Sequence, residues 1–229
     1  MGAPDGRVRR AVGRPRPWRI AFCASDIDSS PHHPLDSQSS TAGDASPARR
    51  AEFAAGRWCA RTALGQLDGP VSAPLLPGLH GAPGWPPGYV GSITHTARFT
   101  AAAVARCGWR DGVRGIGLDA EEATPLPAGV LDVVASPREQ ADLRRLAEAR
   151  AGIPWDTVLF TVKEATYKAV HPLTGEVLTH DDVAASLSAD GRFTAVARVP
   201  GTTASARPRT VRGRWVSGAS VVVSLGVVG

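Results

Sequence analysis

Two acidic residues at the end of an apolar segment are the first candidates for chemistry. The segment Gly115–Glu122 begins with glycine and aliphatic residues and then carries Asp119 and Glu121, two positions apart; Glu122 is the reserve candidate. In an extended strand, residues two apart point to the same side, so both carboxylates are expected on one face. Carboxylate oxygens of this kind suit a hard divalent cation such as Mg2+.

A second segment, about forty residues further on, carries charges at helical spacing. In Phe160–Ala169, Glu164 and Lys168 are four apart and would share a helix face, and Lys163 directly precedes Glu164. Such a pair is commonly a solvated surface ion pair, and an acidic strand end is common too. Together, three carboxylates and two lysines predict a site for a divalent cation and a polyphosphate, because Mg2+ completes its octahedron with water and phosphate oxygens.

The order and separation of these segments resemble those of the Sfp-type 4′-phosphopantetheinyl transferases, and within them the enterobactin-synthetase-associated branch. That family is marked by an (I/V)-G-(I/V)-D-x-E strand end and, roughly forty residues later, an aromatic-(S/T/C)-x-K-E-(A/S)-x-x-K helix; Ile116–Glu121 and Phe160–Lys168 occupy these positions. Gly91–Thr96 is similar to the family's G-S-(I/L)-(S/T)-H segment, and Arg57–Leu64 to its R-x-C-A-R-x-A-L helix. The four motifs stand in the right order and cover about residues 49–170.

The resemblance implies an α+β fold of two similar lobes related by a pseudo-twofold axis, with the active site in the cleft between them. Residues 18–112 would form the N-terminal lobe, which holds the coenzyme A phosphates, and residues 113–229 the C-terminal lobe with the metal and catalytic motifs. Residues 1–17 are rich in Arg, Gly and Pro and are predicted to be a disordered tail. The sequence shows no internal repeat, so the duplication is implied by the resemblance alone.

The implied activity is transfer of the 4′-phosphopantetheine group from coenzyme A to a serine of an apo acyl or peptidyl carrier protein, with release of adenosine 3′,5′-bisphosphate. The implied cofactor is Mg2+, with Mn2+ as an expected substitute, and the implied metal ligands are Asp119, Glu121 and Glu164. The implied catalytic residues are Glu164, which would take the serine proton, with Lys168 and Asp119. The implied coenzyme A contacts are Arg49, Arg57, His95, Lys163 and Lys168.

One departure from the family pattern concerns a loop. Members commonly carry a K-G-x-x-G segment ahead of the G-S-x-x-H strand, whose lysine reaches a coenzyme A phosphate. The corresponding stretch here, Leu76–Gly81, contains no lysine. His80 is a partial replacement that would make binding pH-dependent, since histidine titrates near neutrality. Whether Arg49 or Arg50 compensates is left open.

The charge balance favours an acidic partner. The 229 residues carry a net charge of +5, which would speed encounter with an acidic carrier protein. Two rivals remain: a Mg-dependent phosphotransferase using another nucleotide, although no G-x-x-x-x-G-K-[ST] loop is present, and a basic nucleic-acid-binding protein, although no helix-turn-helix, RNA-recognition or zinc-finger pattern is present. No apolar run approaches the roughly 18 residues needed to cross a bilayer. We expect a monomeric cytoplasmic enzyme that binds neither nucleic acid nor membrane.

Capping residues predict where two helices begin. Ser46 precedes a proline that suits the first helical position, and Ser136 with Glu139 forms the pattern of a capping box. Helices are expected over about 46–67, 136–150 and, for the motif helix, 156–170. Strands are expected over about 18–24, 89–96, 100–106, 115–122, 183–188, 192–199, 210–216 and 219–227.

Overall fold

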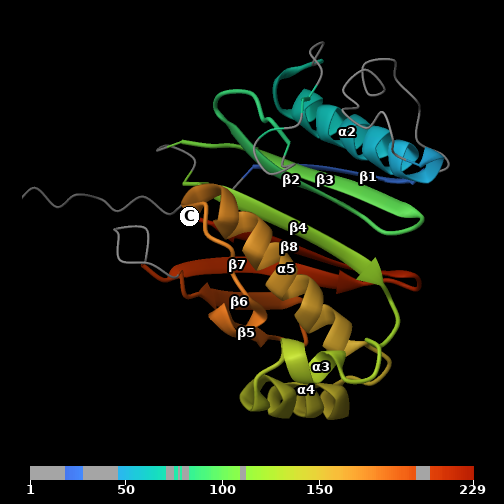
Figure 1. Ribbon diagram of the computed structural model, residues 1–229, viewed down its shortest axis with the longest axis vertical. Coiled ribbons are helices and arrows are strands. Elements are labelled where there is room, and N and C mark those ends of the chain that lie inside the picture. Colours follow the sequence, from blue (N-terminus) through green and yellow to red (C-terminus); the bar gives the residue numbers. More distant parts are fainter. Residues whose placement is uncertain are drawn as a thin grey trace, which may run out of the picture.

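The computed structural model describes residues 19–27, 46–70, 75–76, 78, 83–108, 112–199 and 207–229. The predicted tail at 1–17 and the loop histidine His80 lie outside these residues. Within them the chain forms a mixed α+β fold with two antiparallel sheets and four α-helices (Figure 1). None of the helices in these ranges is both long and apolar enough to cross a bilayer.

The predicted strands are confirmed close to their expected bounds. The strands are β1 (Ile20–Asp26), β2 (Tyr89–His95), β3 (Phe99–Arg106), β4 (Gly115–Glu122), β5 (Val183–Leu187), β6 (Arg192–Ala197), β7 (Arg209–Ser217) and β8 (Val221–Val228). The helices are α2 (Pro47–Asp68), α3 (Val130–Val134), α4 (Pro137–Ala149) and α5 (Trp155–Thr174), with a short 3-10 helix η3 (His180–Asp182). The first sheet has the order β1-β3-β2 and the second β4-β8-β7-β6-β5. The short helix α3 was not predicted, and α5 runs four residues further than expected.

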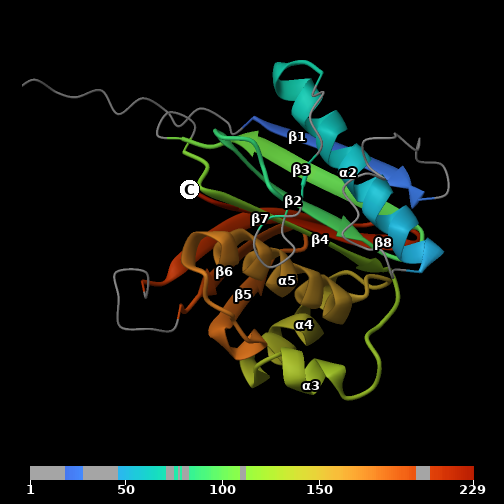
Figure 2. The same cartoon turned by 45° about the horizontal axis from the view of Figure 1, so that its top comes forward.

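Residues of β3 alternate between two cores. Ala102 and Val104 pack on one face of the first sheet in a cluster with residues of α2. Ala101, Ala103 and Ala105 point to the opposite face and join a cluster with Ile116 and Leu118 of β4 and Val227 of β8. The first sheet therefore lies between α2 and the second sheet (Figure 1, Figure 2).

Two glycines let α5 pack directly on β4. A Cβ atom at Gly117 would lie 1.7 Å from the carbonyl oxygen of Ala165, and one at Gly115 would lie 2.3 Å from that of Ala169. Any larger side chain at these positions would push the helix off the strand. The next residues on the same face of β4 are Asp119 and Glu121, so the glycines position the helix against the acidic strand end.

The serine caps are confirmed. The Ser46 hydroxyl accepts a hydrogen bond from the backbone N–H of Arg49 at the start of α2. At the start of α4, Ser136 and Glu139 form both hydrogen bonds of a capping box. These local signals fix where α2 and α4 begin, because each cap satisfies N–H groups that the first helical turn leaves without a partner.

Candidate functional site

An ion pair between Asp119 and Lys168 joins the two motif segments. The Nζ atom of Lys168 donates a hydrogen bond to Oδ1 of Asp119 at 2.6 Å. Asp119 is 4% exposed, whereas the Lys168 side chain is 31% exposed. The carboxylate is therefore nearly excluded from water, and its lysine partner remains accessible to a ligand.

Thr94 holds the Asp119 carboxylate from the neighbouring strand β2. Its hydroxyl donates to Oδ1 of Asp119 at 3.4 Å and accepts from the backbone N–H of Ala120 at 3.1 Å. Ser92, two residues earlier on the same face, donates to the carbonyl oxygen of Leu118. The sequence interpretation missed this role. Two buried hydroxyls at strand spacing in an otherwise apolar segment were the pattern that could have indicated it.

The three predicted metal ligands influence one another electrostatically. Burial raises the pKa of Asp119; the Lys168 ammonium opposes this shift, and the Glu164 charge adds to it. Burial also raises the pKa of Glu121, with further contributions from the charges of Asp119 and Glu164. The charges of Asp119, Glu121 and Glu164 therefore act on one another between β4 and α5.

The donor set fits a Mg2+ ion in its chemistry. In the described ranges, no three His, Cys, Asp or Glu side chains stand close enough together to form a ready-made metal cage. Mg2+ does not need one, since it keeps water and substrate phosphate among its ligands. The second oxygen of Asp119, Oδ2, is buried and has no hydrogen-bond partner among the described residues, so it is an available hard donor.

Lys163 does not reach this site. Its side chain is 2% exposed, and its ammonium contacts Glu139 Oε2 at 3.0 Å and the carbonyl oxygens of Val134 and His180 at 2.7 and 3.0 Å. These contacts use all three donors of the ammonium. The predicted contact between Lys163 and a coenzyme A phosphate is therefore contradicted by the placement of the side chain.

A second group of charges lies where α2 begins and β2 ends. Nε2 of His95 is 3.1 Å from Nη1 of Arg49 and 3.3 Å from Oε2 of Glu52. Burial lowers the pKa of His95, and the Glu52 carboxylate opposes this shift. Arg57, further along α2, is buried with its guanidinium carbon 4.7 Å from the Phe53 ring centroid. Arg49 and His95 are thus brought together from remote segments, while Arg57 lies deeper along the helix.

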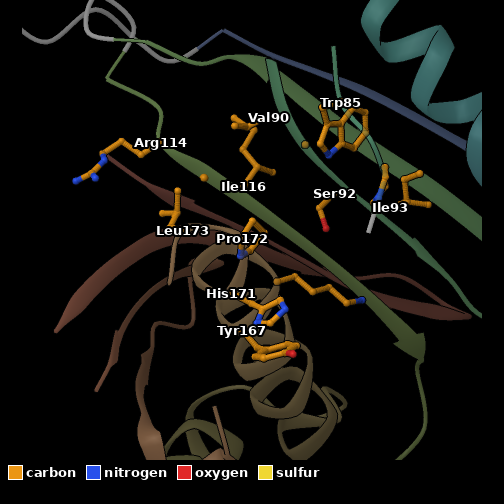
Figure 3. Close-up of a pocket in the computed structure, with 14 residues that line it drawn as sticks. Trp85, Val90, Ser92, Ile93, Arg114, Ile116, Tyr167, His171, Pro172 and Leu173 are labelled. Atoms are coloured by element: carbon orange, nitrogen blue, oxygen red, sulfur yellow. The ribbon is translucent and has the colours of Figure 1, made fainter. Parts of the chain in front are cut away.

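An apolar cavity of about 420 Å3, lined in part by Lys168, lies between the first sheet and α5 (Figure 3). The labelled side chains from the first sheet and the loop before it face those of α5 and β4 across the cavity. The lining includes Trp85, Val90, Ser92, Ile93, Ile116, Tyr167, Lys168, His171, Pro172 and Leu173. Tyr167 stacks on His171 with ring centroids 5.1 Å apart, which forms one wall. The sequence interpretation did not identify this cavity, because its walls come from four separate segments.

Comparison with known proteins identifies the family of the chain. The description "4′-phosphopantetheinyl transferase N-terminal domain" matches residues 38–105, and "4′-phosphopantetheinyl transferase superfamily" matches residues 115–221. The chain is 46% identical over 180 residues to 4′-phosphopantetheinyl transferase Svp of Streptomyces mobaraensis, covering 78% of this chain and 72% of the relative. It is 46% identical over 173 residues to PptT of Mycobacterium tuberculosis, covering 73% and 74% of the two chains. It is 41% identical over 163 residues to Npt of Nocardia iowensis, covering 68% and 70%. These matches confirm the resemblance seen in the four motifs: the chain belongs to the 4′-phosphopantetheinyl transferase family.

Proposed function

We propose that this phosphopantetheinyl transferase moves the 4′-phosphopantetheine arm of coenzyme A onto a serine of an apo acyl or peptidyl carrier protein in a Mg2+-dependent reaction. The observation that carries the proposal is the contact between Asp119 and Lys168. It joins a buried carboxylate to an accessible ammonium beside an apolar cavity. A diphosphate ester with a long arm would place its charge at Lys168 and its arm in the cavity.

Each part of coenzyme A would contact a different part of the site. The diphosphate would lie at Lys168, whose ammonium supplies positive charge. The pantetheine arm would enter the adjoining cavity, whose volume of about 420 Å3 is within the usual range for ligand pockets. The 3′-phosphate of the adenosine end would then reach Arg49 and His95, with Arg57 deeper along α2.

Asp119, Glu121 and Glu164 would hold the Mg2+ ion, with Mn2+ as an alternative. When bound, the ion would supply positive charge that stabilises the phosphoryl oxygens as negative charge builds on them. The buried, unpartnered Oδ2 of Asp119 supports this assignment, because such an oxygen is costly to bury without a cation or a hydrogen-bond donor.

Three side chains would assist the transfer itself: Glu164, Lys168 and Thr94. Glu164 would accept the proton of the carrier serine, whose oxygen attacks the phosphorus that carries the pantetheine arm. The bond from that phosphorus to the bridging oxygen breaks, and adenosine 3′,5′-bisphosphate leaves. Lys168 would stabilise the charge on the leaving phosphate. Thr94 would keep Asp119 oriented throughout, since its hydroxyl proton is already directed to that carboxylate.

The two-lobe organisation is part of the same proposal. Residues 18–112 would form one lobe and residues 113–229 the other, related by a pseudo-twofold axis with coenzyme A between them. The first sheet with α2 and the second sheet with α5 support this division. We propose that the protein acts as a monomer, and that its partners are carrier domains and coenzyme A rather than nucleic acid or a membrane.

Intact-mass spectrometry of a carrier protein tests the proposal. The purified protein is incubated with an apo acyl or peptidyl carrier domain, coenzyme A and Mg2+, and the expected result is a mass gain equal to the phosphopantetheine arm. Asp119→Ala and Glu164→Ala should abolish most of this gain. Asp142→Ala is the matched control, because it removes a partly exposed carboxylate on α4, away from the motif segments. Near-normal modification by Asp119→Ala would contradict the assignment of the site.

A further inference from the structure

Glu52 lies between the two residues proposed to bind the 3′-phosphate. Its Oε2 atom is 3.2 Å from Nη1 of Arg49 and 3.3 Å from Nε2 of His95, and those two nitrogens are 3.1 Å apart. One carboxylate oxygen is thus shared by groups from the start of α2 and the end of β2. The Glu52 side chain is 24% exposed, against 64% for Arg49.

A carboxylate oxygen and a phosphate oxygen compete for the same donors. Both are anionic acceptors that form charge-assisted hydrogen bonds with guanidinium and imidazolium groups. The Nε2 atom of His95 can accept a hydrogen bond from Arg49 when it carries no proton. When it carries a proton, it can donate a hydrogen bond to one anion. A phosphate that reached this nitrogen would have to displace Glu52 or lie within a few ångströms of its charge, where like charges repel.

We propose that Glu52 is an internal competitor for the coenzyme A 3′-phosphate. In the free protein its carboxylate contacts the side-chain nitrogens of Arg49 and His95 that would bind the phosphate. The 3′-phosphate displaces the carboxylate on binding. The inference rests on the proposed function, because it takes the 3′-phosphate as the ligand of these two residues. Glu52 thereby limits how much the 3′-phosphate adds to the affinity for coenzyme A, because the phosphate must first displace the carboxylate.

The alternative role for Glu52 predicts the opposite effect. A carboxylate that only positions Arg49 and His95 would strengthen phosphate binding, since its loss would leave both side chains less ordered. A competitor weakens phosphate binding while it is present. The sign of the affinity change on removal of the charge therefore separates the two roles.

Calorimetric titration of the 229-residue protein with coenzyme A and with 3′-dephospho-coenzyme A tests the proposal. Glu52→Gln keeps the shape of the side chain and removes its charge. We expect it to bind coenzyme A about threefold to fivefold more tightly, the scale of a partly exposed ion pair, with no change for the dephospho ligand. The matched control is Asp68→Asn, which removes a carboxylate from the far end of the same helix, where it pairs with Arg106. The control should leave both affinities unchanged.

Each other outcome overturns the inference. Weaker or unchanged coenzyme A binding by Glu52→Gln would rule out a competitor. An equal gain for both ligands, or a similar gain in Asp68→Asn, would indicate a general effect of net charge. Failure of the proposed function would be distinguishable, because the wild-type protein would then neither bind coenzyme A nor modify a carrier protein.

Discussion

The Nζ atom of Lys163 lies 3.0 Å from Oε2 of Glu139, and both side chains are almost completely excluded from solvent. Glu139 also accepts hydrogen bonds from the backbone N–H groups of Ser136 and Ala185. The pair therefore ties α5 to the start of α4 and to β5. Since Lys163 directly precedes Glu164, this anchor fixes the rotation of α5 and with it the direction of the proposed catalytic carboxylate.

Removing the buried cation should therefore cost stability. We expect Lys163→Met to lower the free energy of unfolding by about 3–5 kcal/mol, because Glu139 would keep a buried charge without its partner. The control Arg145→Met breaks the exposed pair with Asp142 on α4 and should cost about 0–1 kcal/mol. Urea unfolding measures both. If Lys163→Met were stable but bound coenzyme A poorly, the ligand-binding role first predicted for Lys163 would be restored.

Glu139 should make the fold sensitive to acid. Burial raises the pKa of Glu139, but hydrogen bonds from Ala185, Ser136 and Lys163 outweigh it, so the net pKa lies below the ordinary value of 4.5. A carboxyl with a depressed folded-state pKa stabilises the protein above its unfolded value, and that contribution is lost as the pH falls through the folded value. Unfolding free energies measured from neutral pH down through 4.5 should fall more steeply for the wild type than for Glu139→Gln. Parallel curves would contradict this explanation.

Glu121 should have the opposite effect on stability. Burial and the charge of Asp119 raise its pKa, so ionisation opposes folding. The penalty is absent below the unfolded value of 4.5 and is complete above the folded value. Without Mg2+ at neutral pH, Glu121→Gln should raise the unfolding free energy by about 1 kcal/mol, or Tm by about 2–4 °C.

The response of Tm to added Mg2+ tests whether Glu121 is a metal ligand. Thermal unfolding with added Mg2+ should raise Tm for the wild type more than for Glu121→Gln, because the variant lacks a proposed ligand. The control Glu148→Gln removes an exposed carboxylate on α4 and should change neither value. An equal Mg2+ response in Glu121→Gln would exclude Glu121 from the metal site.

Lys168 should affect metal binding and turnover in opposite directions. Its ammonium binds Oδ1 of Asp119 in the free protein and places positive charge beside the proposed metal ligands, so Lys168→Met should bind Mg2+ more tightly in the absence of coenzyme A. The same variant should lose about 100-fold or more in kcat, since the leaving phosphate loses its cation. Calorimetry and carrier modification measure the two effects. Weaker Mg2+ binding would contradict the competition inferred from the ion pair.

Gly117 should be sensitive to the addition of a single methyl group. In Gly117→Ala the new Cβ would meet the Ala165 carbonyl oxygen, so α5 must move away from β4. We expect a loss of about 1–3 kcal/mol in stability and a larger relative loss of turnover. Gly218→Ala is the control, because its Cβ would meet only Val221 at an ordinary 3.5 Å. Similar effects of the two substitutions would exclude close packing as the cause.

Local chemistry explains which parts of the fold were predictable. Ser46 and Ser136 marked helix starts correctly because a cap acts on N–H groups within three residues of itself. Alternating strands and the motif helix were predictable for the same reason, as each depends on a period within one segment. The five-residue helix α3 was missed because it is too short for a helical period to show.

The rest of the site depended on contacts between segments. Lys163 and Lys168 look alike in the motif, yet Lys163 contacts Glu139 in the core and Lys168 lines the cavity. Thr94 and Glu52 were missed because their partners lie on other elements. Sequence periodicity predicts which face of a helix or strand a side chain lies on. It does not predict how far that side chain is from a side chain on another element.

A double-mutant cycle of carrier modification by Asp119→Asn and Glu164→Gln tests most directly whether the two motif segments form one catalytic centre. Each single variant should lose about 100-fold or more in kcat/KM. If the residues act as a unit, the double variant should be about as slow as the slower single variant. Losses that multiply, or near-normal turnover in either single variant, would contradict a shared centre.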